Sequence, residues 1–479
     1  MDASNLQIYW HESQPIYSVS FQSHSDTGSL KRRLVTAGGD NKIRVWQLNF
    51  SAENYRKVET IDFLSSMAQH EQAVNVVRFN SSQTLLASGS DDGQLFLWEK
   101  NDKMVQEFGV EEEELAEFKE CWYISKRLRS TSTTGGSEIY DLCWSPDDTH
   151  IVTASMDNTV RIFNVETGHC TASCSEHHHY AQGVAWDPLN AFIISQSADR
   201  SVNVYNILRD DQGSITGLQL RNKIVKGDVP TRSDSDCRQL HLDSTKQIFL
   251  FHNETLPSFF RRPALSPCGS LLCCPAGILK SCSSQAETNS EEVINAVHIF
   301  TRSSLVHNSN RPVLTLPFLK RPALVCAFNP LGFEITAGSK PYINLPYKLV
   351  FAVATSNEVL IYDTETIQPV SIIGNLHYAP LTDVSWSEDG LMLMVSSTDG
   401  FCSYVSIEKD LFGSVYRGQF PKPTPVKPLV KKHEEPKTSI VNVLPVRRKP
   451  ASEKPDSRTN DSNGNAPKRR VQTAVVNKT

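Results

Sequence analysis

A serine, a histidine and an aspartate, the residue types of many hydrolytic sites, occur close together in this 479-residue sequence as Ser88, His70 and Asp92. A serine nucleophile needs a base and a group that orients the base. These three residues lie in a unit that recurs along the chain, and polar side chains carried by a repeat mostly hold its strands together. The sequence has no G-x-x-x-x-G-K loop, no G-x-S-x-G elbow and no H-E-x-x-H pair. We therefore predict that the protein is not an enzyme, with no catalytic residue and no cofactor.

A second group of chemically capable residues is the run from Cys170 to His179, which reads Cys-x-x-x-Cys-x-x-His-His-His. Two thiolates and two imidazoles can bind zinc, but the usual C-x-x-C spacing is missing. The run connects two repeat units, and one of its histidines is expected to have a structural role in the second unit. We predict no metal site. The eleven cysteines include no C-x-x-C pair, which is typical of a reducing compartment and not of a disulfide framework.

The unit that positions these residues is the stretch from Leu85 to Trp98, which reads as two strands around a tight turn, Gly89–Gly93. Turn residues between two strands of alternating polarity predict a hairpin. Three further copies also have an aspartate six residues before a bulky aromatic residue. The aspartates of the four copies are Asp40, Asp92, Asp157 and Asp199, and the aromatic residues are Trp46, Trp98, Phe163 and Tyr205.

Two later copies are degenerate, with Ser356 before Tyr362 and Asp399 before Val405. Shorter apolar strands precede the hairpins at 16–21, 74–79, 139–144, 183–186, 324–328 and 381–386. The smallest distance between successive hairpin ends is 42 residues, from Phe163 to Tyr205, which is the length of a four-stranded propeller blade. Seven blades are predicted, near 16–50, 74–105, 139–170, 182–210, 248–302, 313–365 and 381–407.

These repeats resemble the WD-repeat family, with Trp-Glu or Phe-Asn in place of the Trp-Asp dipeptide. The resemblance implies an all-β, seven-bladed WD-repeat β-propeller. It also implies that His70, Ser88, Asp92 and Trp98 form a structural tetrad, in which the aspartate accepts hydrogen bonds from the turn and from a neighbouring histidine or serine. We expect the apolar segment Leu6–Trp10 to pair with the last blade, because a closed ring leaves no exposed sheet edge.

The predicted propeller occupies residues 1–415, with three insertions at 101–136, 276–292 and 331–347. The first insertion contains a predicted short helix, 111–120. The segment 421–479 is rich in Pro and Lys, and we predict that this basic tail is disordered. It carries fourteen Lys and Arg against five Asp and Glu, so the rest of the chain has a net charge of −14 within the total of −5. This acidic body suits a basic partner and does not resemble a surface that binds specific nucleic acid sequences.

Several strings outside the repeat pattern resemble the WD-repeat subunit of chromatin assembly factor 1. They are Met156–Phe163, His179–Pro188, Ser197–Val202, Ser258–Arg262 with Gly269–Leu272, Leu345–Ala354, Leu376–Asp383 and Ser396–Ser403. This family is the middle subunit of a three-subunit histone chaperone. The resemblance implies delivery of histone H3–H4 onto newly replicated DNA, with the large and small subunits of the complex as partners. No secretory signal and no membrane-spanning run is visible, which indicates a nuclear or cytosolic protein, and the resemblance implies the nucleus.

The tail contains the segment Pro467–Val476, in which a basic cluster precedes an alternating β-prone run. It is similar to the short motif by which this family and the HIRA-type chaperones dock the anti-silencing H3–H4 chaperone. The similarity implies that Arg469 and Arg470 pair with carboxylates while Val471 and Val475 fill apolar sites, as a strand added to the partner's sheet. A nuclear localisation signal is the alternative. Arg447–Lys449 would be a second, weaker copy or another localisation cluster.

Two further features have a structural and a functional interpretation. Glu111, Glu112, Glu113 and Glu114 would neutralise histone side chains, or they simply form a solvated loop helix, which we favour. Phe259 and Phe260 are expected in a blade core and not at an interface. Two other functions remain open: a replication-independent, HIRA-like chaperone scaffold with different subunits, and a substrate receptor of a ubiquitin ligase.

Overall fold

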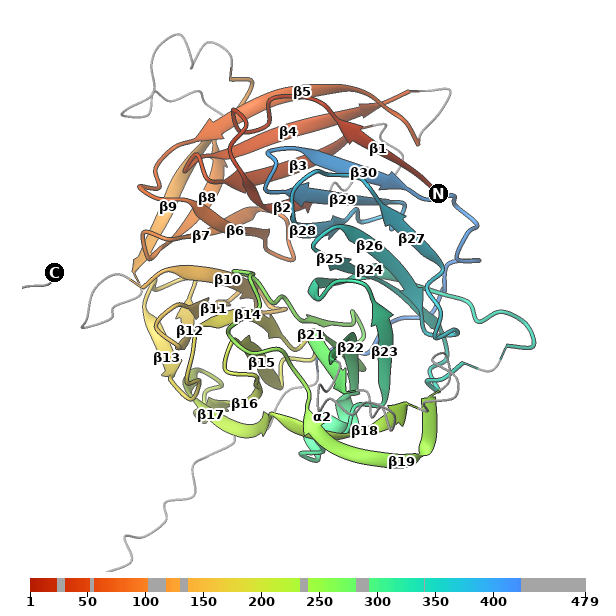
Figure 1. Cartoon of the computed structure of the whole chain (residues 1–479). Coiled ribbons are helices and arrows are strands. Elements are labelled where there is room, and N and C mark those ends of the chain that lie inside the picture. Colours follow the sequence, from red (N-terminus) through yellow and green to blue (C-terminus); the bar gives the residue numbers. More distant parts are fainter. Residues whose placement is uncertain are drawn as a thin grey trace, which may run out of the picture. The chain divides into compact units, whose positions relative to one another are not determined.

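The repeats form seven four-stranded antiparallel sheets, which are the blades of a ring in the computed structural model (Figure 1). The structure describes residues 1–23, 31–51, 56–101, 118–129, 137–232, 240–280, 293–339 and 341–423. In each blade the first apolar strand of the repeat lies innermost, and the hairpin follows outward. The predicted seven-bladed, all-β propeller is confirmed.

The strands of the first three blades are β2 (Ile16–Gln22), β3 (Lys31–Gly38), β4 (Ile43–Phe50) and β5 (Val58–Met67); β6 (Val74–Phe79), β7 (Leu85–Ser90), β8 (Gln94–Asn101) and β9 (Cys121–Arg129); and β10 (Ile139–Trp144), β11 (His150–Ser155), β12 (Val160–Asn164) and β13 (Cys170–Cys174). The fourth and fifth blades are β14 (Ala181–Trp186), β15 (Phe192–Ser197), β16 (Val202–Arg209) and β17 (Ile215–Ile224); and β20 (Ala264–Leu265), β21 (Leu271–Lys280), β22 (Val293–Thr301) and β23 (Leu314–Leu319).

The strands of the sixth blade are β24 (Ala323–Phe333), β25 (Lys348–Thr355), β26 (Glu358–Asp363) and β27 (Ser371–Gly374). The C-terminal strands of the seventh blade are β28 (Leu381–Trp386), β29 (Met392–Ser397) and β30 (Cys402–Ser406). Outside the blades lie the two-stranded sheet of β18 (Lys226–Arg232) and β19 (Leu240–Phe249) and the short helix α2 (Arg302–Val306). No helix among the described residues is long and apolar enough to cross a membrane.

The repeated aspartate builds the turn between the second and third strands of a blade. In the second blade the Asp92 carboxylate accepts a hydrogen bond of 2.8 Å from the backbone N–H of Gln94, and Gly93 between them has a φ of 74°. This left-handed conformation favours Gly and Asn over other residues. The same bond, from the second residue after the aspartate, recurs at Asp40, Asp157, Asp199 and Asp399.

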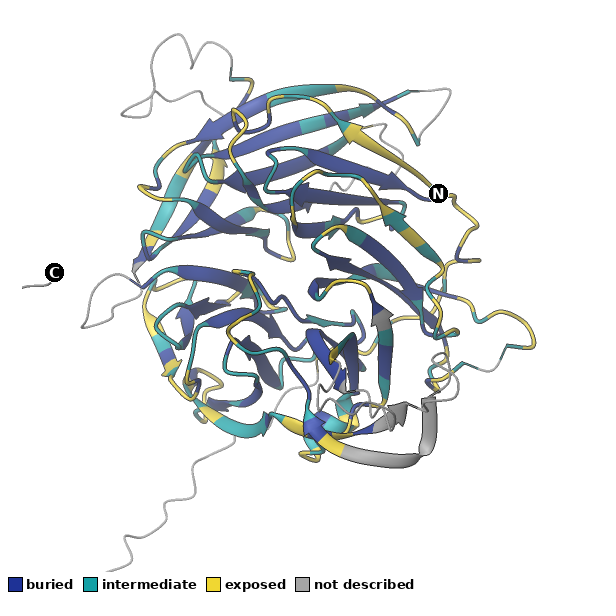
Figure 2. Cartoon of the chain, viewed as in Figure 1, coloured by how far each residue is buried: buried dark blue, intermediate teal, exposed yellow. Residues whose placement is uncertain are grey.

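The apolar core lies between the blades, and most of the inner blade strands are buried (Figure 2). Each pair of neighbouring blades shares a cluster of buried side chains, including the pair formed by the last and the first blade. In one such cluster Val35 and Val45 of the first blade pack against Phe96 and Trp98 of the second. A single blade would expose this apolar surface on both of its faces, so burial favours the closed ring.

The N-terminal strand closes the ring, as predicted. The strand β1 (Asp2–Leu6) is the outermost strand of the seventh blade and pairs antiparallel with β30, from Asp2 opposite Ser406 to Leu6 opposite Cys402. The predicted range, Leu6–Trp10, was wrong. An outermost strand is mostly exposed and therefore needs little apolar sequence. Trp10 lies beyond the end of this strand, and its side chain packs edge-on against Trp46.

Strands enter all three predicted insertions, and β9 among them is an outermost strand. The strand β9 lies within the predicted insertion 101–136, and β21 extends into 276–292 as far as Lys280. The strand β24 likewise extends into 331–347, where residues 334–339 and 341–347 form neither helix nor strand. The fifth sheet spans 264–319 instead of the predicted 248–302. Half-exposed outer strands lack the alternation of polarity by which the inner ones were recognised.

The ordered unit extends beyond the predicted boundary at residue 415. The Tyr416 and Phe420 rings lie 4.9 and 5.1 Å from the ring of Tyr347, and the Phe412 ring lies 5.4 Å from that of Phe333. The predicted helix 111–120 falls mostly outside the described residues, which resume at residue 118 without helix.

Trp10 gives a test of ring closure. Its fully buried side chain belongs to a cluster with Trp46 of the first blade and Met392 and Tyr404 of the seventh. Trp10→Ala should therefore lower the free energy of unfolding by about 3–5 kcal/mol, measured by chemical denaturation. Tyr9→Ala, which removes a neighbouring but exposed ring, should change it by less than about 0.5 kcal/mol. Equal effects of the two substitutions would contradict closure through Trp10.

Candidate functional site at the centre of the ring

The predicted tetrad residues meet in the second blade. The two ring nitrogens of His70 lie 2.9 Å from Asp92 Oδ2 and 2.7 Å from Ser88 Oγ, and Trp98 Nε1 donates to Ser88 Oγ at 2.8 Å. His70 precedes the inner strand, whereas Ser88 and Trp98 lie on the second and third strands. The set therefore ties three strands of one blade to its turn. Ser88 is buried, and its hydroxyl is occupied by these partners, so the arrangement favours the structural interpretation.

The same network recurs in other blades with substitutions. The first blade uses His11, Thr36, Asp40 and Trp46. The fourth uses His177, Ser195, Asp199 and Tyr205. In the seventh blade His377 contacts Asp399 at 3.0 Å, and Val405 takes the place of the aromatic donor.

Burial and pairing set the protonation of these networks. Burial lowers the pKa of His11 and of His177, although the neighbouring aspartates oppose this effect. Burial alone would raise the pKa of Asp40, but His11 and Arg44 hold it below its usual value. Burial therefore favours the neutral form of His11 and His177, in which one ring nitrogen is an acceptor for the hydroxyl.

The residues with zinc-type chemistry do not assemble into a metal site. His177 is the tetrad histidine of the fourth blade, whereas Cys170 is on the outer strand β13 and is exposed. Among the described residues no group of three or more His, Cys, Asp or Glu side chains is arranged to hold a metal ion.

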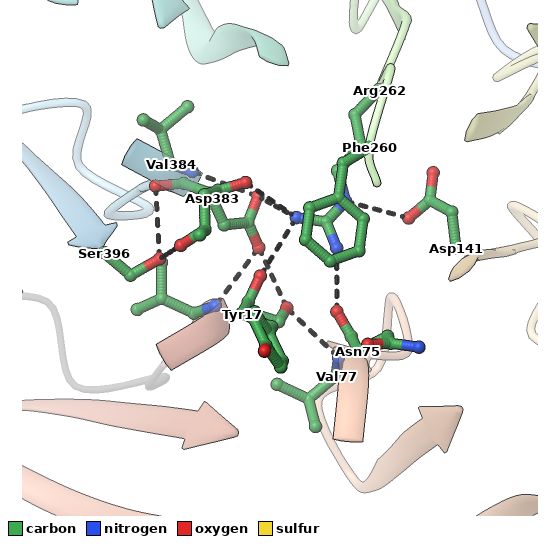
Figure 3. Close-up of polar contacts among 12 residues, drawn as sticks. Tyr17, Asn75, Val77, Asp141, Phe260, Arg262, Asp383, Val384 and Ser396 are labelled. Atoms are coloured by element: carbon green, nitrogen blue, oxygen red, sulfur yellow. Dashed lines mark hydrogen bonds and ion pairs between the residues drawn. The ribbon is translucent and has the colours of Figure 1, made fainter. Parts of the chain in front are cut away.

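The buried side chain of Arg262 lies among residues of several blades near the centre of the ring (Figure 3). Its guanidinium pairs with Asp141 of the third blade at 3.3 Å and with Asp383 of the seventh at 3.2 Å. It also donates to the backbone carbonyls of Tyr17, Thr382 and Asn75, which belong to the first, seventh and second blades. One buried side chain thus joins the first three blades to the seventh.

A second arginine balances the charge of this cluster. Arg78 of the second blade pairs with Asp383 at 2.8 Å and donates to Ser18 Oγ at 2.8 Å. Burial alone would raise the pKa of Asp383, but Arg262 and Arg78 hold it below its usual value. Burial raises the pKa of Asp141 despite the same arginines. The ring centre therefore contains two cations and two carboxyl groups in direct contact, which is an arrangement that joins strands.

Backbone hydrogen bonds join Arg261 and Arg262 to the blades that the Arg262 side chain does not contact. The N–H of Arg262 donates to Leu324 O of the sixth blade, and the N–H of Arg261 donates to Gln182 O of the fourth. Gly183 permits the second approach, because a Cβ at this position would lie 2.0 Å from Arg261 O. Together Arg261 and Arg262 contact the other six blades just before the chain enters the fifth.

Phe259 is exposed and not in a blade core, so the expectation from the sequence was wrong for this residue, whereas Phe260 is buried beside this cluster. The Arg262 guanidinium lies 4.1 Å from the centroid of the Phe260 ring, whereas Phe259 is exposed. The sequence signal that would have indicated a position at the ring centre is the pair Arg261–Arg262 just before a strand. Two adjacent arginines are not expected in a blade core, because buried charges need partners.

Two predicted sets of partner-binding residues, the tail residues Arg469, Arg470, Val471 and Val475 and the acidic residues 111–114, lie outside the described residues. Glu120, at the end of the predicted helix, is buried and pairs with Arg33 and with Lys100. Glu120 therefore joins the first two blades and is not available to a partner.

Comparisons with known proteins match this architecture. Residues 1–412 match the model of the CAF1B/HIR1 β-propeller domain. The chain is 46% identical over 474 residues to the B-type subunit of chromatin assembly factor 1 from Saccharomyces cerevisiae, covering 94% of this chain and 97% of that protein. It is 38% identical to the protein of the same name in Schizosaccharomyces pombe, covering 86% and 89%. Protein HIR1 of Yarrowia lipolytica is 25% identical over 84% of this chain and 37% of its own length.

Removing the central arginine should weaken the whole ring. Arg262→Met leaves Asp141 and Asp383 with buried charge and one partner fewer, so the free energy of unfolding should fall by about 3–5 kcal/mol in chemical denaturation. The matched control, Arg321→Met, removes an exposed arginine and should have an effect below about 0.5 kcal/mol. A loss no larger than that of the control would contradict the central role of Arg262.

The neutral histidines predict a pH dependence. The pKa of His11 and His177 is lower in the folded chain than the value of about 6.5 expected when unfolded, so below that pH the unfolded chain binds more protons. Stability should therefore fall as the pH decreases from 6.5, by up to about 1.4 kcal/mol per pH unit for each histidine. Denaturation at pH 7.5, 6.5 and 5.5 should show a shallower dependence for His177→Gln. The exposed control His178→Gln should keep the slope of the unmodified protein, and an unchanged slope in His177→Gln would contradict the assignment.

Proposed function

The chain belongs to the family of the CAF1B/HIR1 β-propeller domain, and from this membership we propose that it helps to deposit histone H3–H4 onto newly replicated DNA as a subunit of chromatin assembly factor 1. The observation that carries the proposal is the 46% identity to the yeast protein of that complex, because it extends over nearly the full length of both chains. The large and small subunits of the complex would be its partners, and the nucleus would be its place of action.

The proposed role is that of a non-catalytic scaffold. The polar sets that resemble catalytic groups are engaged within the blades, since Ser88 and Ser195 are buried and bonded to their own histidines. The ring centre is closed by the Arg262 cluster. A rigid ring of this kind offers its loops and outer strands to other proteins.

The tail would supply the contact with the incoming histone carrier. We propose that Arg469 and Arg470 pair with carboxylates of the anti-silencing H3–H4 chaperone while Val471 and Val475 fill apolar sites along an added strand. Tethering a histone carrier to the ring would raise the local histone concentration at the site of assembly. The acidic run of Glu111 to Glu114 is a further candidate for contact with basic histone side chains.

The alternative scaffold functions predict different companions. A HIRA-like, replication-independent scaffold would share the tail contact but bind other subunits, and the identity to protein HIR1 is only 25%. A ubiquitin-ligase receptor would associate with a cullin adaptor. Affinity purification of the tagged full chain, followed by mass spectrometry, separates the three. The proposal expects the two other chromatin assembly factor 1 subunits and the anti-silencing chaperone.

Tail variants test the docking contact in the same purification. Deletion of 467–479 and the double substitution Arg469→Glu with Arg470→Glu should each abolish recovery of the anti-silencing chaperone, while the large and small subunits are retained. Val471→Asp should also abolish it. Because Val471→Asp preserves the basic cluster, nuclear localisation of this variant should be unchanged, which separates docking from a localisation signal.

The matched control is Lys431→Glu with Lys432→Glu, which reverses two adjacent charges elsewhere in the tail, outside both Arg-containing clusters, and should leave recovery of the chaperone unchanged. Unchanged recovery in the Val471→Asp variant would refute strand docking. Recovery of cullin adaptors in place of the chromatin assembly factor subunits would refute the proposed function itself.

A further inference from the structure

Exposed aromatic side chains gather at one face of the ring. Because every blade repeats the same strand order, the inner strands all begin at one face, which we call the leading face. Tyr9, Phe259 and Tyr378 lie in the segments that lead into β2, β20 and β28, with 81%, 63% and 108% of their surface exposed. They are the three most exposed of the large apolar side chains among the described residues. Exposed aromatic residues are the side chains most enriched at protein interfaces.

Phe259 is part of a continuous set of rings around the ring centre. Its ring centroid lies 6.5 Å from that of Tyr140 and 6.4 Å from that of Phe260. Tyr180 extends the set beyond Tyr140 at 6.3 Å, and Tyr17 extends it beyond Phe260 at 6.0 Å. We call these five residues the aromatic rim. The rim covers the Arg262 cluster and joins the first, third and fourth blades.

Two carboxylates lie among these rings. Glu138 accepts a hydrogen bond of 3.2 Å from the Tyr140 hydroxyl, and Asp91 accepts one of 2.5 Å from Asn75 Nδ2. Neither carboxylate forms an ion pair with any residue that the structure describes. Burial and the neighbouring Glu138 raise the pKa of Asp91, as expected for two acidic groups that lack a nearby cation.

The arginines beneath the rim do not neutralise this charge. Arg262 and Arg78 are matched by Asp141 and Asp383, with which they are in direct contact. Asp91 and Glu138 therefore have no ion-pair partner among the residues that the structure describes. Aromatic faces attract cations through the ring quadrupole, and carboxylates attract them through charge, so both features select the same ligand chemistry.

We propose that the aromatic rim binds a basic peptide segment, with a Lys or Arg side chain seated against the exposed Phe259 ring and paired with the partly exposed Glu138 and Asp91. This site belongs to the propeller and does not depend on the tail contact proposed above. An acidic segment would be repelled by the carboxylates. A purely apolar segment would leave them unpaired beside it, which is unfavourable.

The test measures binding of a fluorescein-labelled peptide of four Gly-Arg repeats to the full chain by fluorescence anisotropy. The Gly-Arg peptide should bind at least tenfold more tightly than a Gly-Gln peptide of the same length. Phe259→Ala and Glu138→Gln should each weaken binding of the Gly-Arg peptide by about three- to thirtyfold, the range expected for loss of one cation–aromatic or charge contact. Phe259→Trp should retain binding.

Matched controls carry the same changes away from the leading face. Tyr342→Ala removes an exposed aromatic ring near the sixth blade, and Glu166→Gln removes an exposed carboxylate in the connection between β12 and β13. Both should bind like the unmodified protein. Phe259 is exposed, so Phe259→Ala should keep the thermal unfolding midpoint within about 2 °C. Equal binding of the Gly-Gln peptide, or unchanged binding by both Phe259→Ala and Glu138→Gln, would overturn the proposal.

Discussion

The structure depends on one constraint, which is that no blade encloses a core of its own. The apolar side chains of each blade are buried only against the next blade, and the cluster between the seventh and the first blade is as necessary as the others. Burial of apolar surface is the dominant favourable term in folding, and here it is complete only when the ring is closed. Closure with β1 therefore joins the two ends of the ordered chain, and Trp10 adds a buried contact at the same junction.

The Arg261–Arg262 dipeptide joins the inner strands of the blades at the centre of the ring. The inner strands would leave unpaired backbone carbonyls there, and water alone would not join strands from distant repeats. The Arg262 guanidinium has five donors in a fixed plane and uses them for carbonyls and carboxylates of four blades. Arg262 has carboxylate partners, and the buried Arg261 guanidinium donates to the carbonyls of Ser197, His252 and Asn253, so the cost of burying the charges is offset by contacts that also fix the positions of the blades.

The closed ring and the basic tail have different roles in the proposed function. A ring that is closed at its edge and at its centre holds its loops in fixed positions, so a partner can bind without paying for their ordering. The basic tail has a sequence rich in Pro and Lys, which predicts disorder. Such a segment suits capture of a partner by an added strand. The leading face combines aromatic rings held on the blades with carboxylates that select a basic segment.

The sequence by itself determined the repeat, the number of blades, six of the seven inner strands and the tetrad of the second blade. These follow from local patterns: alternation of apolar residues, an aspartate in a tight turn, and an aromatic residue at a fixed spacing. It also indicated the family. The polar outer strands β1, β9 and β27 were not recognised, because a strand exposed at the rim of a blade needs no apolar pattern.

Only the tertiary structure decided what occupies the centre of the ring and which surface is left for partners. Asp141, Arg262 and Asp383 are more than a hundred residues apart in the sequence, and each alone reads as an ordinary polar residue. The sequence placed Phe259 in a core, and the structure exposes it at the leading face. Local patterns report how a residue relates to its own strand. Contacts between the inner strands of different blades arise only when the ring closes, and closure depends on all seven blades at once.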